Sequence, residues 1–242
     1  ILFERLRWRR AVKLVKVVMV PLVGAGFILS TLHQSSLGSL YLILPSKLHP
    51  LWYSPLLPVL FWLSAVAVGL AMVIFESGMS ARAFGRALEF NLLQEISRVM
   101  AVFLGLFLLL RFWDLGFWRG SLGAAFRLSG PGSLEAGMFW LEVALLALPV
   151  LLVLLPGVRG NPQALFACSA MVVGGFLVNR LNVSTTGLEV SSGVHYFPSF
   201  IEISVTLSIV TLGLVIFSLA VRYLAVFQEA RPKLARHTPE GV

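Results

Sequence analysis

The stretch "SPLLPVLFWLSAVAVGLAMVIF", residues 54–75, contains no charged residue. A helix rises about 1.5 Å per residue, so this run is long enough to cross the roughly 30 Å hydrocarbon core of a bilayer. Backbone groups in lipid must be hydrogen-bonded within their own segment, and the alternating pattern of a barrel strand is missing from this run. The stretch therefore predicts a transmembrane helix.

Five further apolar runs have the same character, although those at 97–113 and 163–180 have shorter cores. Only 12% of the 242 residues are charged and 58% are hydrophobic, whereas soluble domains carry about 25% charged residues. The sequence predicts an all-α fold, a polytopic transmembrane helix bundle in which residues 1–242 form a single domain. The six spanning helices are predicted near 14–32, 54–75, 97–113, 134–155, 163–180 and 199–222.

Lys and Arg are distributed unevenly between the two sides of these helices. Fourteen of the 19 lie in the N-terminal stretch, in the 76–98 and 156–162 connections and in the tail from Arg222. This excess predicts that both termini are cytoplasmic, in agreement with an even number of crossings. The outer connection 33–53 is too short to span and is expected to lie along the membrane surface. Because the basic residues border apolar runs, we expect membrane lipid and no nucleic acid as a partner.

Polar side chains gather near the predicted outer ends of the helices. An ionisable group inside a span costs about 2.5–3.5 kcal/mol on insertion scales and indicates function. Glu142 lies nine residues into its predicted helix, beyond the reach of a capping role, so we expect either a buried Arg partner or a role in proton transfer. The other candidates on this side are His33, Gln34, Arg111, Asp114, Asn179, Arg180, Asn182, His195, Tyr196 and Glu202.

Some of these residues have a simpler structural explanation. Ser199 and Glu202 fit a capping box in front of an apolar run. Arg180 could extend outward to the membrane surface, and His33 could cap a helix end. With these alternatives open, Glu142 and Glu202 are the candidates for a proton path.

The chain lacks the ligand pattern of a metal or haem site. It has one cysteine, Cys168, and its four histidines lie at helix ends, in loops or in the tail. A structural zinc site or an iron–sulfur cluster needs several such ligands, and a haem between helices needs paired axial ligands on facing spans. We therefore expect no metal, haem or iron–sulfur cluster in this chain.

Five motifs occur in a characteristic order: "LFERL", "TLHQSSLGSL", "KLHPLW", "MFWLEV" and "YFPSFIEI". In this order they resemble the HybB-type membrane subunit of nickel–iron hydrogenases, which belongs to the NrfD/PsrC superfamily of quinone-interacting membrane proteins. Relatives of the DsrP type share much of the pattern. The resemblance implies that the chain is the C-terminal part of a protein of about ten helices.

The resemblance also implies a function. It points to a membrane subunit of a respiratory oxidoreductase that exchanges electrons between a periplasmic, ferredoxin-like iron–sulfur subunit and menaquinone or ubiquinone. Such a subunit lies in the bacterial inner membrane beside catalytic subunits such as a hydrogenase or a multihaem cytochrome, and it is not catalytic alone. The alternatives are a proton- or ion-translocating transporter module and a membrane anchor only.

Quinone chemistry couples two electrons to two protons, so the site needs hydrogen-bond donors and a group that exchanges protons. Histidine changes charge near neutral pH and suits that exchange. On the resemblance, His33 and Glu142 are the candidate catalytic residues. His33, Gln34 and Arg180 are the candidate quinone-binding residues.

Overall fold

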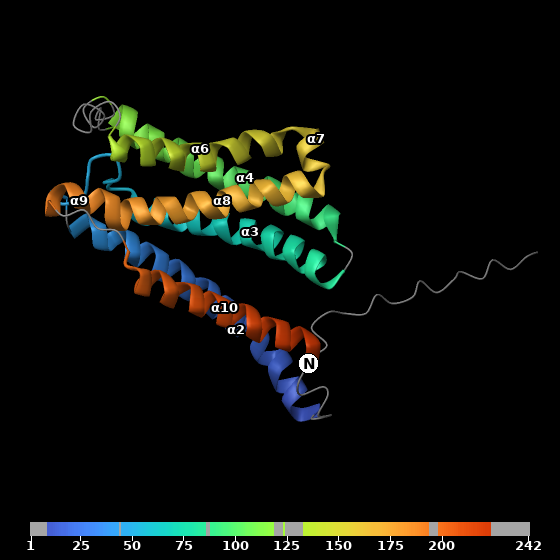
Figure 1. The fold of residues 1–242 in the computed structure, drawn as a ribbon. Coiled ribbons are helices and arrows are strands. Elements are labelled where there is room, and N and C mark those ends of the chain that lie inside the picture. The colour runs from blue at the N-terminus through green and yellow to red at the C-terminus, as the bar shows by residue number, and fades with distance from the viewer. Residues whose placement is uncertain are drawn as a thin grey trace, which may run out of the picture. The chain divides into compact units, whose positions relative to one another are not determined.

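The computed structural model describes residues 9–43, 45–85, 88–118, 123, 133–193 and 198–223. Within these ranges every regular element is a helix, as Figure 1 shows. Six of the described helices are long and apolar enough to cross a membrane, which confirms the predicted all-α fold class. They are α2 (Arg9–Leu40), α3 (Leu57–Phe84), α4 (Phe90–Phe112), α6 (Leu134–Leu154), α8 (Pro162–Leu181) and α10 (Phe200–Tyr223).

The chain divides into two compact units, and the candidate site lies in the unit formed by residues 26–196. In this unit α3, α4, α6 and α8 form a bundle: α3 packs against α4 and α8, and α6 packs against the same two helices. The other unit comprises residues 1–25 and 197–242 and contains α10.

Close packing holds the bundle together, because lipid gives apolar helices little hydrophobic reason to associate. Ala67 and Ala71 of α3 are at most 1% exposed in the main core cluster, beside Met100 of α4. A Cβ added to Gly175 of α8 would lie 2.7 Å from Leu146 Cδ2 of α6. Small residues therefore set how closely the helices approach.

The helix ends carry recognisable signals. Ser133 caps α6 by accepting a hydrogen bond from Ala136 N at 3.3 Å, and Asn161 caps α8 by accepting from Gln163 N at 2.9 Å, as expected for these residue types. Proline occupies the first turn of both α3 and α8, and α3 ends at Gly85 with a φ of 62°. These local signals determine where the helices of the bundle begin and end.

The first helix is longer than predicted, and this changes the segment that follows it. α2 continues to Leu40, and the 3₁₀ turn η1 (Tyr41–Ile43) extends it. Residues 33–43 therefore belong to the helix and not to the predicted connection, and the expected position of the rest of that connection along the membrane surface stays a prediction. Within the rest, Leu51 and Trp52 are only 1% and 3% exposed. They pack with Phe61 and Phe139 in a second core cluster, so the segment from Leu48 to Ser54 is part of the bundle.

Gly38 provides a test of how α2 meets α3. A Cβ at this position would lie 2.6 Å from Pro58 Cα and 2.7 Å from Leu57 O, and neither backbone atom can move aside easily. We expect Gly38→Ala to lower the free energy of unfolding by about 1–3 kcal/mol, as overpacking does. Thermal unfolding of the detergent-purified protein measures the change.

The matched control for this substitution is Gly26→Ala on the same helix, where nothing lies within 4 Å of the added Cβ. It should leave the protein unchanged or stabilise it by roughly 0.5–1 kcal/mol, since alanine is the better helix former. Equal effects of the two substitutions would contradict the close contact between Gly38 and Pro58.

Candidate functional site

The centre of the site is Glu142 of α6, which is 1% exposed. Its Oε1 accepts hydrogen bonds from Arg111 Nη1 and, at 2.7 Å, from Asn179 Nδ2. Its Oε2 accepts from Asn182 Nδ2 at 2.8 Å and from Trp52 Nε1 at 3.1 Å. Four donors from different parts of the bundle thus converge on one carboxylate, which we call the Glu142 centre.

Helix geometry brings these donors to the same end of the bundle. Arg111 lies in the last turn of α4, and Asn179 and Asn182, three residues apart, lie on one face at the end of α8. Two π-helical segments begin at this end: η2 (Trp113–Trp118) continues α4 and η3 (Asn182–Thr186) continues α8. Such wide turns are rare and occur frequently at functional sites.

The hydrogen bonds indicate the charge state of the Glu142 centre. An ionised carboxylate only accepts hydrogen bonds, and here all four contacts to Glu142 come from N–H donors. A buried charge is tolerated when it is paired and fully hydrogen-bonded. The predicted buried Arg partner of Glu142 is therefore confirmed as Arg111. For Glu142 to take up a proton, one of its donors would have to move away first.

Arg180 points into the bundle, so the alternative of an arginine extended toward the membrane surface is wrong. Its Nη1 donates to Asn179 Oδ1 at 3.0 Å, and its Nη2 donates to Ser64 Oγ at 2.9 Å and to Phe61 O at 3.3 Å. The guanidinium carbon lies 3.7 Å from the centre of the Phe61 ring and 4.4 Å from that of Phe176. Asn179 thus connects Arg180 to the Glu142 centre.

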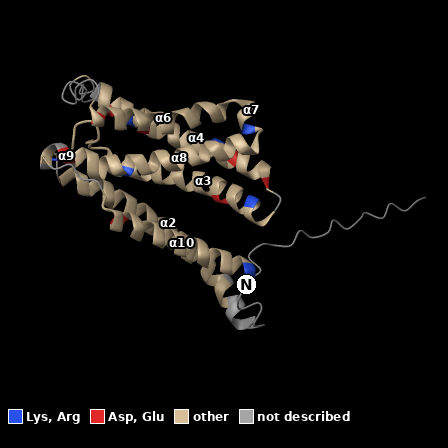
Figure 2. Ribbon diagram, viewed as in Figure 1, with Lys and Arg blue, Asp and Glu red and all other residues tan. Residues whose placement is uncertain are grey.

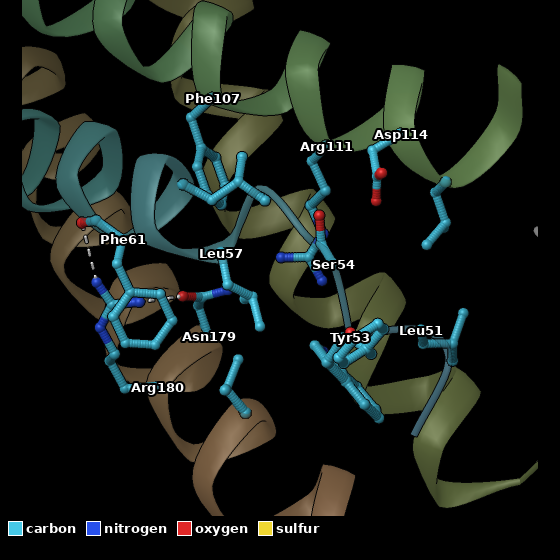
Figure 3. Close-up of a pocket in the computed structure, with 14 residues that line it drawn as sticks. Leu51, Tyr53, Ser54, Leu57, Phe61, Phe107, Arg111, Asp114, Asn179 and Arg180 are labelled. Carbon is cyan, nitrogen blue, oxygen red and sulfur yellow. Dashed lines mark hydrogen bonds between the residues drawn. The ribbon is translucent and has the colours of Figure 1, made fainter. Parts of the chain in front are cut away.

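A small cavity lies beside this network (Figure 3), lined by Ser54, Phe107, Arg111, Asp114 and Arg180 among others. Its volume is about 20 Å³. That is enough for about one water molecule, whereas pockets for cofactor-sized ligands usually measure about 300–1,000 Å³. The cavity is therefore too small for a quinone ring.

The structure does not join the other predicted quinone-binding residues to this network. His33 is exposed on α2 and Gln34 is partly buried, and neither lines the cavity. Both lie well before the end of α2, so the alternative that His33 caps a helix end is wrong. The side-chain oxygen of Gln34 is buried and has no hydrogen-bond partner within the part of the chain that the structure describes.

Glu202 lies in α10, in the other unit. Its carboxylate accepts a hydrogen bond from Ser199 N at 2.9 Å, and Glu202 N donates to Ser199 Oγ at 3.4 Å. The capping box predicted from the sequence is confirmed. His195 and Tyr196 lie outside the described residues.

Two residues of the site were missed at the sequence level. Trp52, which lies in the predicted outer connection 33–53, donates to Glu142. His49 is 5% exposed, its ring lies 5.6 Å from that of Trp52, and its Nδ1 accepts from Leu51 N at 3.2 Å. Burial lowers the pKa of His49, opposed by the charge of Glu135. The motif "KLHPLW" was the available signal, because it carries both residues.

The sequence is similar to those of several known proteins. Residues 4–190 match the family model described as polysulphide reductase, NrfD. The chain is 31% identical over 229 residues to the probable Ni/Fe-hydrogenase 2 b-type cytochrome subunit of Escherichia coli K12, covering 93% of this chain and 57% of that protein. It is 27% identical over 234 residues to the integral membrane subunit of menaquinone reductase from Nitratidesulfovibrio vulgaris Hildenborough, covering 88% and 55%.

The name of the Escherichia coli relative includes a b-type cytochrome, so we tested whether the described residues fit a haem. The two described histidines are His33, exposed on α2, and His49, whose Nδ1 accepts a backbone hydrogen bond. The cavity beside the Glu142 centre is far smaller than a haem. Within the described ranges the residues do not form a haem site, and the prediction that the chain carries no haem stays a prediction.

No solved structure was found to match the chain. The chain spans about half the length of the curated relatives it matches, between 49% and 57% of each. The match to the family model nevertheless covers most of the chain, from the "LFERL" motif to the end of the bundle. The chain therefore belongs to the polysulphide reductase NrfD family of integral membrane proteins.

Proposed function

We propose that the chain is part of an integral membrane subunit of a quinone-linked oxidoreductase complex. In this role it exchanges electrons between a periplasmic iron–sulfur subunit and the membrane quinone pool, without a redox centre of its own. Membership of the NrfD family carries the proposal. One relative is named as a menaquinone reductase subunit and another as a hydrogenase subunit, which supports a quinone, menaquinone or ubiquinone, as the substrate.

Within this function His33 and Gln34 are the proposed contacts of the quinone head group. The buried side-chain oxygen of Gln34 lacks a partner in the described structure, and a side-chain amide can both donate to a quinone carbonyl and accept from a quinol hydroxyl. His33 is exposed on the same helix and could exchange the protons that accompany electron transfer. Arg180 is the third proposed contact; because the cavity beside it is too small for a quinone ring, a quinone would have to reach Arg180 after the bundle opens at this point.

Glu142 and Glu202 remain the proposed members of a proton path. The four-donor environment of Glu142 makes it a proton carrier only if a donor such as Asn179 or Trp52 turns away. Glu202 is exposed at the start of α10, with its carboxylate engaged in the capping box.

The proposed location is the bacterial inner membrane with both termini in the cytoplasm. Figure 2 shows charged residues near both ends of the α3–α4–α6–α8 bundle and long uncharged stretches between them. Arg82 in the last turn of α3 and Arg159 between α6 and α8 lie at the end opposite the Glu142 centre. Basic residues mark the cytoplasmic side, so the Glu142 centre faces the periplasmic half of the membrane.

Reporter fusions test this orientation. Alkaline phosphatase fused after Ser46 should be active, because this exposed position is assigned to the periplasm, and the enzyme fused after Gly160 should be inactive. Green fluorescent protein at the same two positions should give the reverse pattern. A reporter at the C-terminus that works only in the periplasm would contradict the proposed topology.

The function itself is tested on the assembled complex. An affinity tag on this chain should recover a partner with ferredoxin-like cysteine motifs from detergent-solubilised membranes. The recovered complex should reduce or oxidise a quinone, as well as an artificial dye that reacts with the catalytic subunits directly. Recovery without any iron–sulfur partner, together with transport of an ion or solute by the reconstituted protein, would favour the transporter alternative.

A further inference from the structure

Arg111 makes only part of the hydrogen bonds that its side chain requires. Its Nη1 donates to Glu142, and the side chain is 8% exposed. Its Nη2 is buried and has no hydrogen-bond partner among the described residues. Leaving a donor of a charged group unsatisfied in the interior is costly, so an acceptor is expected next to Nη2.

The small cavity is where such an acceptor can lie. Arg111 lines it together with Ser54 and Asp114, and Figure 3 shows Arg111 and Asp114 pointing from one side toward Ser54 and Tyr53 on the other. Ser54 is 4% exposed, and its Oγ accepts a hydrogen bond from Leu56 N at 3.0 Å. The hydroxyl proton of Ser54 is then left to donate to a guest in the cavity.

The volume of the cavity and the charges around it identify the chemical class of the molecule that occupies it. A volume of about 20 Å³ holds about one water molecule. The described charged residues that line the cavity are Arg111, Arg180 and Asp114, and Arg111 is ion-paired with Glu142, which does not line the cavity itself. A monatomic anion would unbalance this set in a low-dielectric interior, whereas water would not.

We propose that the cavity is a binding site for one internal water, which accepts hydrogen bonds from Arg111 Nη2 and Ser54 Oγ. Since Arg111 Nη1 holds Glu142, the water completes the guanidinium and fixes its orientation toward the carboxylate. It also places a water molecule beside the Glu142 centre, whose carboxylate itself contacts only hydrogen-bond donors. This inference is independent of the proposed electron-transfer function.

Radiolytic hydroxyl labelling of the intact complex in membranes, read out by mass spectrometry, tests the proposal. Radicals formed from bound water modify side chains next to that water, even when those side chains are buried. Phe107 is 2% exposed and lines the cavity, whereas Phe139 is 0% exposed and does not line it. We expect Phe107 to be labelled several-fold faster than Phe139, and equal rates would overturn the water site.

A pair of substitutions that each add one methylene group locates the labelling. Val183 lines the cavity and Val172 does not, and both are buried. Val183→Ile should fill the space and reduce labelling of Phe107 to the level of Phe139, whereas Val172→Ile should leave it unchanged. Equal loss in both variants would contradict the site. If Val183→Ile fails to assemble, the wild-type ratio of Phe107 to Phe139 still decides the question.

An anion as the occupant is tested in the same experiment. Replacing chloride in the buffer by gluconate should leave the labelling of Phe107 unchanged, because water remains in the cavity. A change in labelling that follows the chloride concentration would overturn water as the guest and assign the cavity to a halide.

Discussion

Glu142→Leu is expected to lower the free energy of unfolding by about 3–5 kcal/mol, because removing one partner leaves the buried charge of Arg111 uncompensated. The side chains of both partners are at most 8% exposed. Asn179, Asn182 and Trp52 would lose their shared acceptor in the same step. The measurement is thermal unfolding of the detergent-purified protein, followed by tryptophan fluorescence.

A double substitution separates charge from packing. Adding Arg111→Leu to Glu142→Leu removes the uncompensated charge, so the double variant should be no less stable than Glu142→Leu alone. Contacting residues of one network are not additive. If the losses of stability in Glu142→Leu and Arg111→Leu simply add in the double variant, the two residues do not act as one unit.

The exposed pair Arg98–Glu95 is the matched control. It joins the same two residue types at 2.8 Å, but its side chains are 51% and 63% exposed. Glu95→Leu should change the free energy of unfolding by at most about 1 kcal/mol, as surface ion pairs do. If Glu142→Leu proves as mild as Glu95→Leu, the Glu142 centre does not stabilise the bundle as described.

His33→Ala is expected to lower quinone-dependent turnover by about 10²–10⁴-fold, the usual effect of losing a general acid–base group. The same complex should retain its activity with a soluble dye that bypasses this subunit. His33 lies within α2, well before Leu40, so its loss removes no helix cap and should leave the fold unaffected. The measurement compares quinone and dye activities in membranes that contain equal amounts of complex.

Ser39→Ala on the same helix is the control for His33→Ala. The Ser39 hydroxyl donates to Ser35 O at 2.9 Å and is exposed, so its removal should change neither activity. Parallel loss of quinone and dye activity in His33→Ala would assign His33 to assembly of the complex. Unchanged quinone activity would remove His33 from the site.

The positions of the six spanning helices could be predicted from the sequence, because apolar length alone decides whether a segment can cross a bilayer. The helix ends were harder. The apolar run that begins near residue 14 is followed by "HQSSLGSL", whose polar residues suggested an exit from the membrane, yet α2 continues to Leu40. Serine and threonine are tolerated there because their hydroxyls bond the backbone one turn earlier, as Thr31 does with Phe27 O.

The candidate site, too, could be predicted only in part from the sequence. Glu142 was identifiable from the sequence because a carboxylate deep in an apolar helix must find a partner. Which partner it finds depends on how α4, α6 and α8 pack, since Arg111 and Asn179 are separated from Glu142 by 31 and 37 residues. Trp52 lies in the predicted outer connection 33–53, and only the folding of this segment onto the bundle makes it a donor to Glu142.

The sequence by itself determined that the chain belongs in a membrane, that it is helical and that one of its helices carries a buried charge. Each of these properties follows from the composition of a single segment. Tertiary structure alone decided that Arg180 turns inward between Phe61 and Phe176, and that the space beside Arg111 is too small for a quinone ring. Both depend on distances between helices, which small residues such as Gly175 set to within a methyl group. No single segment of the chain encodes such a distance.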